Sequence, residues 1–256
     1  MTAKLGVITG ASGGIGRACA KKFAAEGWFL LLVDLNDAVQ GVPKEIAARP
    51  GATITAVTAD ITLEHDVERV RAAAAATRLP VRFLGLVAGI NQAAAAIESI
   101  EMADWDRVMN INLRANVLMM KAFIPALREA GGASIVTVSS YWGRAGHGFF
   151  SAYCASKAAL ISLTQCAAAE LAPAIRVNSL APGNVATPMH FNALRDEAAK
   201  RGIPESEMRA IEWAKIPLAR PADPAEMAAG VYFLASQEGS YLTGATIDVN
   251  GGCGFY

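Results

Sequence analysis

Seven short apolar runs alternate with longer, often alanine-rich stretches along this chain, and this alternation restricts its fold more than any other feature. The runs lie at 5–9, 29–33, 53–57, 83–88, 134–139, 175–181 and 246–249. Most of the stretches between them are long enough for a crossover helix. Runs that are apolar throughout are typical of a parallel sheet covered on both faces. The sequence therefore predicts an α/β protein, with a doubly wound parallel sheet of seven strands and helices on both faces.

We expect this sheet to belong to a single domain. The chain has 256 residues, of which 53% are hydrophobic, and this is ample for one substantial core. No Pro/Gly/Ser linker, composition shift or repeat of roughly 20 to 50 residues divides the sequence. Residues 1–256 are therefore predicted to form one domain.

Residues 188–222 are the irregular part of the pattern, because four prolines interrupt two short helical segments there. A connection of this length is usually either functional or disordered. Met189, Phe191, Trp213 and Ile216 would give the segment buried apolar contacts, which argues against full disorder. We predict that it forms a lid over the substrate.

Charge and composition exclude several classes of partner. Lys plus Arg and Asp plus Glu both number 23, so the formal charge is zero, and no basic block indicates nucleic-acid binding. No apolar run reaches the ~18 residues of a membrane span, and the N-terminus shows no signal-peptide pattern. The four cysteines and three histidines lack metal-ligand spacing. We expect a cytoplasmic protein with reduced cysteines, no metal, and no nucleic-acid or membrane partner.

A glycine-rich turn follows the first apolar run and leads at once into a helical pattern at 17–26. Gly10, Gly13, Gly14 and Gly16 would let the backbone turn sharply and approach a pyrophosphate, which a helix N-terminus attracts. An ordinary glycine turn is the alternative. The position between the first strand and the first helix favours a dinucleotide site, and hence a Rossmann-like sheet.

Two carboxylates follow the next two strands. Asp34 comes at the end of the second strand, where it can accept hydrogen bonds from both ribose hydroxyls and would repel a 2′-phosphate. Leu35 and Asn36 add no positive charge, so NAD is favoured over NADP. A loop-capping role for Asp34 is the alternative. Asp60, after the third strand, is placed to receive the adenine amino group.

Tyr153 and Lys157 lie four residues apart in a helical pattern, so one turn of helix brings a phenol beside an ammonium group. A neighbouring cation stabilises phenolate, and we therefore expect Lys157 to lower the pKa of Tyr153 toward neutrality. Such a phenol can exchange a proton with an alcohol or carbonyl. The alternative is a surface lysine beside a half-buried tyrosine.

These features together resemble the short-chain dehydrogenase/reductase family over essentially the full length of the chain. The resemblance implies that Ser140 and Tyr153 hold the substrate oxygen, and that Lys157 contacts the nicotinamide ribose. Asn112 matches the asparagine that opens a helix and holds a water linking the lysine to solvent. The catalytic set implied is Asn112, Ser140, Tyr153 and Lys157.

The same resemblance implies a cofactor-binding set drawn from the ends of several strands. Its members are Gly10, Ser12, Gly14, Ile15, Gly16, Asp34, Asp60, Ile61, Ala88, Gly89, Tyr153, Lys157, Pro182, Gly183, Val185 and Thr187. One departure is that Leu86 and Val87 replace the usual Asn-Asn before Ala88 and Gly89. The hydrogen bonds that brace the central sheet must therefore come from other residues.

Substrate contacts are expected from the segment after Ser140 and from the start of the lid. The candidates are Ser140, Trp142, His147 and Met189, with Phe149, Phe150 and His190 nearby. Packing in the core or between subunits is the alternative for each. The mixed aromatic and polar character resembles family members that act on polyols, sugars or small diols.

The favoured function is therefore an NAD-dependent oxidoreductase that interconverts a secondary alcohol and a ketone. The alternatives are a 3-oxoacyl-carrier-protein reductase and a non-catalytic dinucleotide-sensing protein. The resemblance also implies a homotetramer, with helices at 103–129 and 151–172 at one interface and the C-terminal strand at another.

Overall fold

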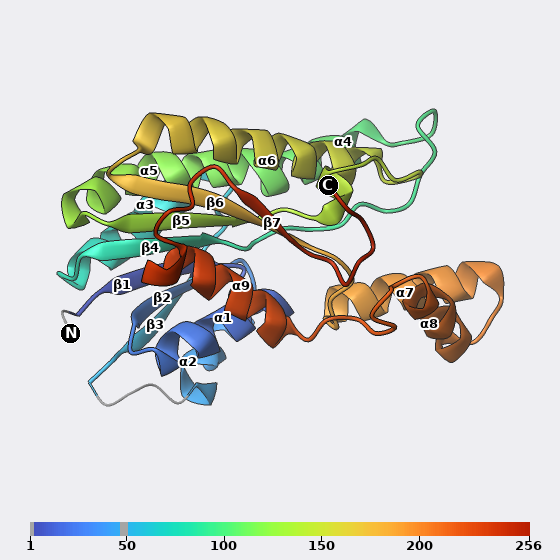
Figure 1. The fold of residues 1–256 in the computed structure, drawn as a ribbon, viewed down its shortest axis with the longest axis horizontal. Helices are drawn as coiled ribbons and strands as arrows, with labels where there is room; N and C mark the ends of the chain where they lie inside the picture. Colours follow the sequence, from blue (N-terminus) through green and yellow to red (C-terminus); the bar gives the residue numbers. More distant parts are fainter. Residues whose placement is uncertain (1–2, 47–50) are drawn as a thin grey trace.

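The computed structural model describes residues 3–46 and 51–256, and these form a parallel sheet with helices on both faces (Figure 1). The seven strands follow the order β3-β2-β1-β4-β5-β6-β7. They are β1 Leu5–Thr9, β2 Phe29–Asp34, β3 Ile54–Thr58, β4 Val81–Leu86, β5 Ala133–Val138, β6 Ile175–Pro182 and β7 Thr246–Val249. Every expected strand is present, with its ends within two residues of the prediction. The predicted fold class is confirmed.

The strand order reverses beside β1, and this reversal positions the site. The chain runs outward from β1 to β3, then crosses back so that β4 pairs with the other side of β1. At such a switch point the connections leaving the carboxyl ends of the two central strands diverge, and they leave a crevice between them. The glycine turn after β1 lies at this crevice.

The helices form a layer on each face of the sheet. Figure 1 shows α3, α5 and α6 over one face, and α1 and α9 over the other with α2 beside them. Their bounds are α1 Gly14–Ala25, α2 Val42–Glu45, α3 Glu64–Ala76, α4 Met102–Met109, α5 Ala115–Ala130, α6 Ser151–Leu171, α7 Pro188–Arg201, α8 Glu205–Ala214 and α9 Pro224–Ala235. Each face carries its own buried apolar cluster.

Across residues 3–46 and 51–256, no helix has both the length and the apolar character needed to cross a membrane.

The Thr9 hydroxyl makes hydrogen bonds that brace the central sheet, where Leu86 and Val87 replace the usual Asn-Asn pair. It donates to the Gly85 carbonyl (3.3 Å) and accepts from the backbone N–H groups of Val87 (3.0 Å) and Ala88 (3.2 Å). Thr9 is fully buried. One side chain therefore holds the end of β1 against the segment leaving β4. The sequence predicts that such bonds come from residues other than the missing asparagines.

A π-helical turn at Asn110–Arg114 joins α4 to α5. The helix predicted over 103–129 is present over these residues as α4, the π-helical turn and α5. Asn112 lies within the π-helical turn, and not at the start of a helix as the family resemblance implied. The turn is stabilised from inside, because Asn116 Nδ2 donates to the Asn112 carbonyl (2.7 Å). Such turns leave backbone groups outside the regular α-helical ladder and frequently occur at functional sites.

Helices α7 and α8 pack on each other beyond the carboxyl edge of the sheet, at the right of Figure 1. Thr187 caps α7 by accepting from His190 N (3.3 Å), and Gly202 ends it with a left-handed conformation (φ 66°). Leu194, Ala198 and Met208 form a small core between the two helices. Met189, which was expected to be buried, is 47% exposed.

We expect Thr9→Val to lower the free energy of unfolding by about 2 kcal/mol, because two backbone N–H groups at the start of the β4 connection lose their acceptor. Thr55→Val is the matched control, since Thr55 makes one long bond (3.4 Å) from its strand to the Leu30 carbonyl. Urea denaturation measures both variants. Equal losses would show that the Thr9 brace adds no stability.

Candidate active site

Two adjoining cavities open at the crevice beside β1. The larger, of about 820 Å³, extends from the glycine turn past the ends of β2 and β3. The smaller, of about 190 Å³, lies between the end of β5, the start of α6 and the start of α7. Ile15, Val87, Gly89, Ile90, Thr187 and Met189 line both. The two cavities therefore form one continuous cleft.

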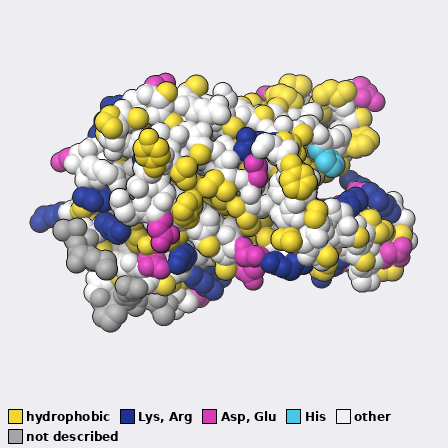
Figure 2. All heavy atoms as spheres, viewed as in Figure 1, with side chains coloured by type: hydrophobic (Ala, Val, Ile, Leu, Met, Phe, Trp, Pro, Cys, Tyr) yellow, Lys and Arg dark blue, Asp and Glu magenta, His cyan; other side chains and the backbone are white. Residues whose placement is uncertain are grey.

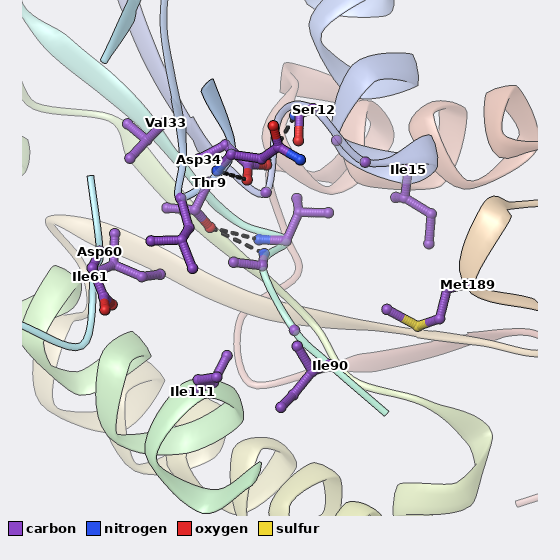
Figure 3. A pocket seen from close by; sticks show the side chains of 18 of the residues that line it. Thr9, Ser12, Ile15, Val33, Asp34, Asp60, Ile61, Ile90, Ile111 and Met189 are labelled. Carbon is purple, nitrogen blue, oxygen red and sulfur yellow. Dashed lines mark hydrogen bonds between the residues drawn. The ribbon is translucent and has the colours of Figure 1, made fainter. Parts of the chain in front are cut away.

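The predicted cofactor-binding residues divide between these cavities. The larger is lined by Gly10, Ser12, Gly14, Ile15, Gly16, Asp34, Asp60, Ile61, Ala88, Gly89 and Thr187. The smaller is lined by Tyr153, Lys157, Pro182, Gly183 and Val185, and again by Ile15, Gly89 and Thr187. Figure 3 shows Asp34 and Ser12 at one end of the larger cavity and Met189 at the other.

The glycine turn requires its glycines. Gly10 has a left-handed backbone (φ 65°), and a Cβ there would lie 2.8 Å from the Ala88 Cα. A Cβ on Gly16 would overlap the Gly10 carbonyl oxygen. No side chain caps the N-terminus of α1, which begins at Gly14, so N–H groups of its first turn remain for a ligand. This end of the cleft is suited to bind a diphosphate.

The Asp34 carboxylate is fixed by two backbone N–H groups. Its Oδ2 accepts from Ser12 N (3.0 Å) and its Oδ1 from Asn36 N (2.9 Å), as Figure 3 shows for Ser12. Asp60 lies two residues beyond β3, and its Oδ1 accepts from the backbone and hydroxyl of Thr62 (2.9 and 2.7 Å). Both carboxylates therefore line the larger cavity in set orientations.

Ser140, Tyr153 and Lys157 line the smaller cavity together. Tyr153 lies in the first turn of α6 and Lys157 in the second, and Lys157 Nζ is 5.6 Å from the centre of the tyrosine ring. Lys157 is 4% exposed, and its Nζ donates to the Val138 carbonyl at the end of β5 (2.9 Å). Ser140 lies two residues beyond β5, so the end of this strand and the start of α6 form one wall.

Burial controls the pKa values of this pair. It lowers the pKa of Lys157 to about 8, so the amine is still largely protonated at neutral pH. It raises the pKa of Tyr153, against the opposing effect of a hydrogen bond with Ser140. The expectation that Lys157 brings the Tyr153 pKa down is therefore wrong for this structure. Removal of the phenol from water outweighs any attraction by the cation.

Asn112 joins the π-helical turn to the cleft wall. Its Oδ1 accepts from Ile90 N (2.8 Å), and its Nδ2 donates to the Ile90 carbonyl (3.0 Å) and to Ser156 Oγ (3.1 Å). A Cβ on Gly89 would lie 3.1 Å from Lys157 Nζ and 3.2 Å from Asn112 Oδ1. Gly89 therefore lets the lysine and the asparagine approach the same point of the backbone.

The predicted substrate residues do not all reach the smaller cavity. Ser140, Trp142 and Met189 line it, and so does His190. His147 is exposed and lies outside both cavities, because its ring stacks on Trp142 with centroids 4.1 Å apart. Phe150 likewise contacts Trp142 and does not line the cavity.

Several polar side chains at the site, among them Tyr141, Asn184 and Gln92, were not singled out from the sequence. Tyr141 and Asn184 line the smaller cavity. Gln92 is buried, accepts from Tyr153 N (3.0 Å) and donates to the Phe149 carbonyl (3.1 Å), so it fixes the start of α6. The signal available for Gln92 and Asn184 was their position soon after the carboxyl ends of β4 and β6.

A buried tyrosine and lysine in a cavity continuous with that of the glycine turn, on a doubly wound sheet, indicate a class: the nicotinamide-dependent α/β oxidoreductases. Comparison with known proteins agrees. A family model described as enoyl-(acyl carrier protein) reductase matches residues 10–254. The (3R)-3-hydroxyacyl-CoA dehydrogenase of Mus musculus is 35% identical, over 97% of this chain and 95% of that protein.

Two further relatives extend the comparison. The 2,5-dichloro-2,5-cyclohexadiene-1,4-diol dehydrogenase of Sphingobium indicum is 33% identical, over 98% of this chain and 96% of that protein. The solved 3-ketoacyl-(acyl-carrier-protein) reductase from Brucella melitensis, complexed with NADH, is 32% identical and superposes with a TM-score of 0.87, covering 99% of both chains. The chain belongs to the short-chain dehydrogenase/reductase family and is an NAD(P)-dependent oxidoreductase acting on CH–OH groups. The resemblance seen in the sequence is confirmed.

The lowered pKa of Lys157 makes stability depend on pH. The unfolded chain keeps the lysine proton up to about pH 10.5, whereas the folded protein releases it near pH 8. Between these values the free energy of unfolding of the wild type should rise relative to Lys157→Met, by up to about 1.4 kcal/mol per pH unit. Urea denaturation across this range measures the difference.

Lys121→Met is the control for this experiment, because Lys121 is exposed on α5. Its difference from the wild type is subtracted from that of Lys157→Met at each pH. A remainder that stays constant with pH would mean that the buried amine titrates as it does in the unfolded chain.

Proposed function

We propose that this protein is an NAD-dependent dehydrogenase/reductase that interconverts a secondary alcohol and its ketone, with a polyol, sugar or small diol as substrate. The observation that carries the proposal is the shared wall of Ser140, Tyr153 and Lys157, in a small cavity continuous with the glycine-turn cavity. A non-catalytic dinucleotide sensor would have no need of this grouping.

The cleft fits a dinucleotide on its own chemistry. The uncapped start of α1 suits a diphosphate, and the fixed carboxylate of Asp34 suits a ribose diol. Pro182, Gly183, Val185 and Thr187 would hold the nicotinamide half, beside Tyr153 and Lys157. When bound, the nicotinamide supplies or accepts the hydride.

The protein's own groups manage the substrate oxygen and its proton. Ser140 and Tyr153 would hold that oxygen, and Tyr153 would exchange its hydroxyl proton with it. Lys157 would donate to the ribose, and its positive charge would offset part of the cost that burial imposes on phenolate. Asn112 would position Lys157 and relay the proton toward solvent through a water.

The charges around the larger cavity support NAD over NADP. The Asp34 carboxylate would repel a 2′-phosphate. Arg17, in the first turn of α1, is not among the residues that line the cavity, and it pairs with Glu45 (2.7 Å). Arg107 lines this cavity, but it pairs with Asp104 (2.5 Å). Neither arginine therefore offers an unshared charge to a phosphate.

The size of the smaller cavity supports a compact substrate. This cavity measures about 190 Å³, and the nicotinamide would occupy part of it, which leaves room for a small substrate. We propose that α7 and α8 act as the lid, since Met189, His190 and Ala193 of α7 line this cavity. The likeness to the 3-ketoacyl-(acyl-carrier-protein) reductase keeps an acyl-carrier substrate as the second candidate.

We also propose that residues 1–256 form one domain, and that the protein is a cytoplasmic homotetramer. The edge strand β7 is half-buried along its length, and Figure 2 shows hydrophobic side chains gathered over that edge. Figure 2 also shows charges of both signs interspersed on this face. All four cysteines are free, which suits a reducing compartment.

Tyr153→Phe should lower kcat by at least about a hundredfold, because it removes the proton donor and leaves the cleft otherwise unchanged. NADH affinity, measured by fluorescence titration, should stay within a few-fold. Tyr141→Phe is the matched control, as Tyr141 lines the same cavity, and it should keep most of its activity. Retained turnover in Tyr153→Phe would refute the mechanism.

Asp34→Asn should shift the ratio of NAD to NADP affinity by about tenfold in favour of NADP, since it removes a charge facing the 2′-position. Asp37→Asn, three residues along and exposed, serves as control. Binding titrations with both cofactors measure the ratio. A wild type that prefers NADP would overturn the cofactor assignment and favour the acyl-carrier alternative.

A further inference from the structure

His190 occupies a distinctive place in the cleft. It lies in the first turn of α7, lines the smaller cavity together with Ser140 and Tyr153, and is half-buried. Its backbone N–H donates to the Thr187 hydroxyl (3.3 Å), which holds this turn at the cleft. The ring is therefore held within the small volume that also contains the proposed reacting groups.

Within the described residues, the ring nitrogens of His190 have one hydrogen-bond partner. The indole Nε1–H of Trp213, on α8, donates to His190 Nε2 (3.4 Å). An indole N–H can only donate, so Nε2 must accept and cannot carry a proton. The proton of a neutral imidazole must then be on Nδ1, and no residue of the described chain hydrogen-bonds Nδ1.

The surroundings of the ring favour the neutral form. Burial lowers the pKa of His190 and outweighs the opposite effect of Glu212, and Arg209 lowers this pKa further. Glu212 is itself paired with Lys215 (2.6 Å). A neutral imidazole with its proton on Nδ1 is a directed hydrogen-bond donor.

We infer that His190 is a neutral donor, protonated on Nδ1, that selects substrates carrying a second oxygen close to the reacting carbon. This inference rests on the proposed function, in which Ser140 and Tyr153 hold the reacting oxygen. A donor in the same cavity of about 190 Å³ can reach only an oxygen a few atoms away. The partner is a hydroxyl, carbonyl or carboxylate oxygen, and a vicinal diol or hydroxyketone fits.

Substitutions at His190 separate hydrogen bonding from packing. His190→Leu removes the donor, whereas His190→Asn keeps an amide N–H where Nδ1 lies. The probes are trans-1,2-cyclohexanediol and cyclohexanol, oxidised with NAD. His190→Leu should lower the ratio of kcat/KM for diol over cyclohexanol about tenfold, and His190→Asn should keep most of it.

Trp213→Phe tests the positioning partner. Without the indole N–H, the imidazole proton is free to occupy either nitrogen, and the diol preference should fall part of the way toward that of His190→Leu. A ratio unchanged in His190→Leu, or an equal loss on both substrates in all three variants, would overturn the inference and leave His190 a packing residue.

A measurement independent of turnover uses ¹⁵N-histidine labelling. The chain has three histidines, and the spectrum of His190→Asn identifies the His190 signals by their loss. The wild type should show Nδ1 protonated, with a shift on adding the diol but not on adding cyclohexanol. A proton on Nε2, or no response to the diol, would overturn the inference.

The two proposals fail in different ways. A wild type that oxidises neither alcohol would count against the proposed activity, and the ¹⁵N spectrum would then decide the role of His190. A wild type that oxidises both alcohols, with a proton on Nε2 of His190, would keep the activity and remove the selectivity.

Discussion

The close contact between the end of β1 and the segment leaving β4 is the constraint on which both cavities depend. The Thr9 hydroxyl binds one carbonyl of β4 and two backbone N–H groups of this segment, and the absence of a Cβ on Gly10 lets Ala88 approach. Gly89 and Ile90, which continue the same segment, then meet Lys157 and Asn112. A shift here would therefore move the dinucleotide crevice and the proposed proton-transfer groups together.

Much of this arrangement was predictable from the sequence. Buried parallel strands must be apolar on both faces, so their runs stand out, and a glycine turn between strand and helix marks the switch point. The helical spacing of Tyr153 and Lys157 placed both groups on one side of α6. These features depend on local periodicity, which the sequence records directly.

The remainder depends on tertiary contacts. A π-helical turn at Asn110–Arg114 has no distinct sequence pattern, and the side chains of Asn112 and Asn116 hydrogen-bond there to groups that only the folded chain brings together. The direction of the Tyr153 pKa depends on how much water the fold removes, which composition does not report. His147 and His190 were both candidates by chain position, but stacking on Trp142 keeps one outside the cavity while α7 carries the other into it.

The small core of Leu194, Ala198 and Met208 lets α7 and α8 pack on each other separately from the core of the sheet. Because α7 and α8 bury these side chains against each other, much of their sequence can change without altering how the strands pack. The α7 wall of the smaller cavity is then free to diversify, while the glycine turn and the ends of β2 and β3 stay constant. Grafting 188–214 from a relative into this chain would be the direct route to a new specificity.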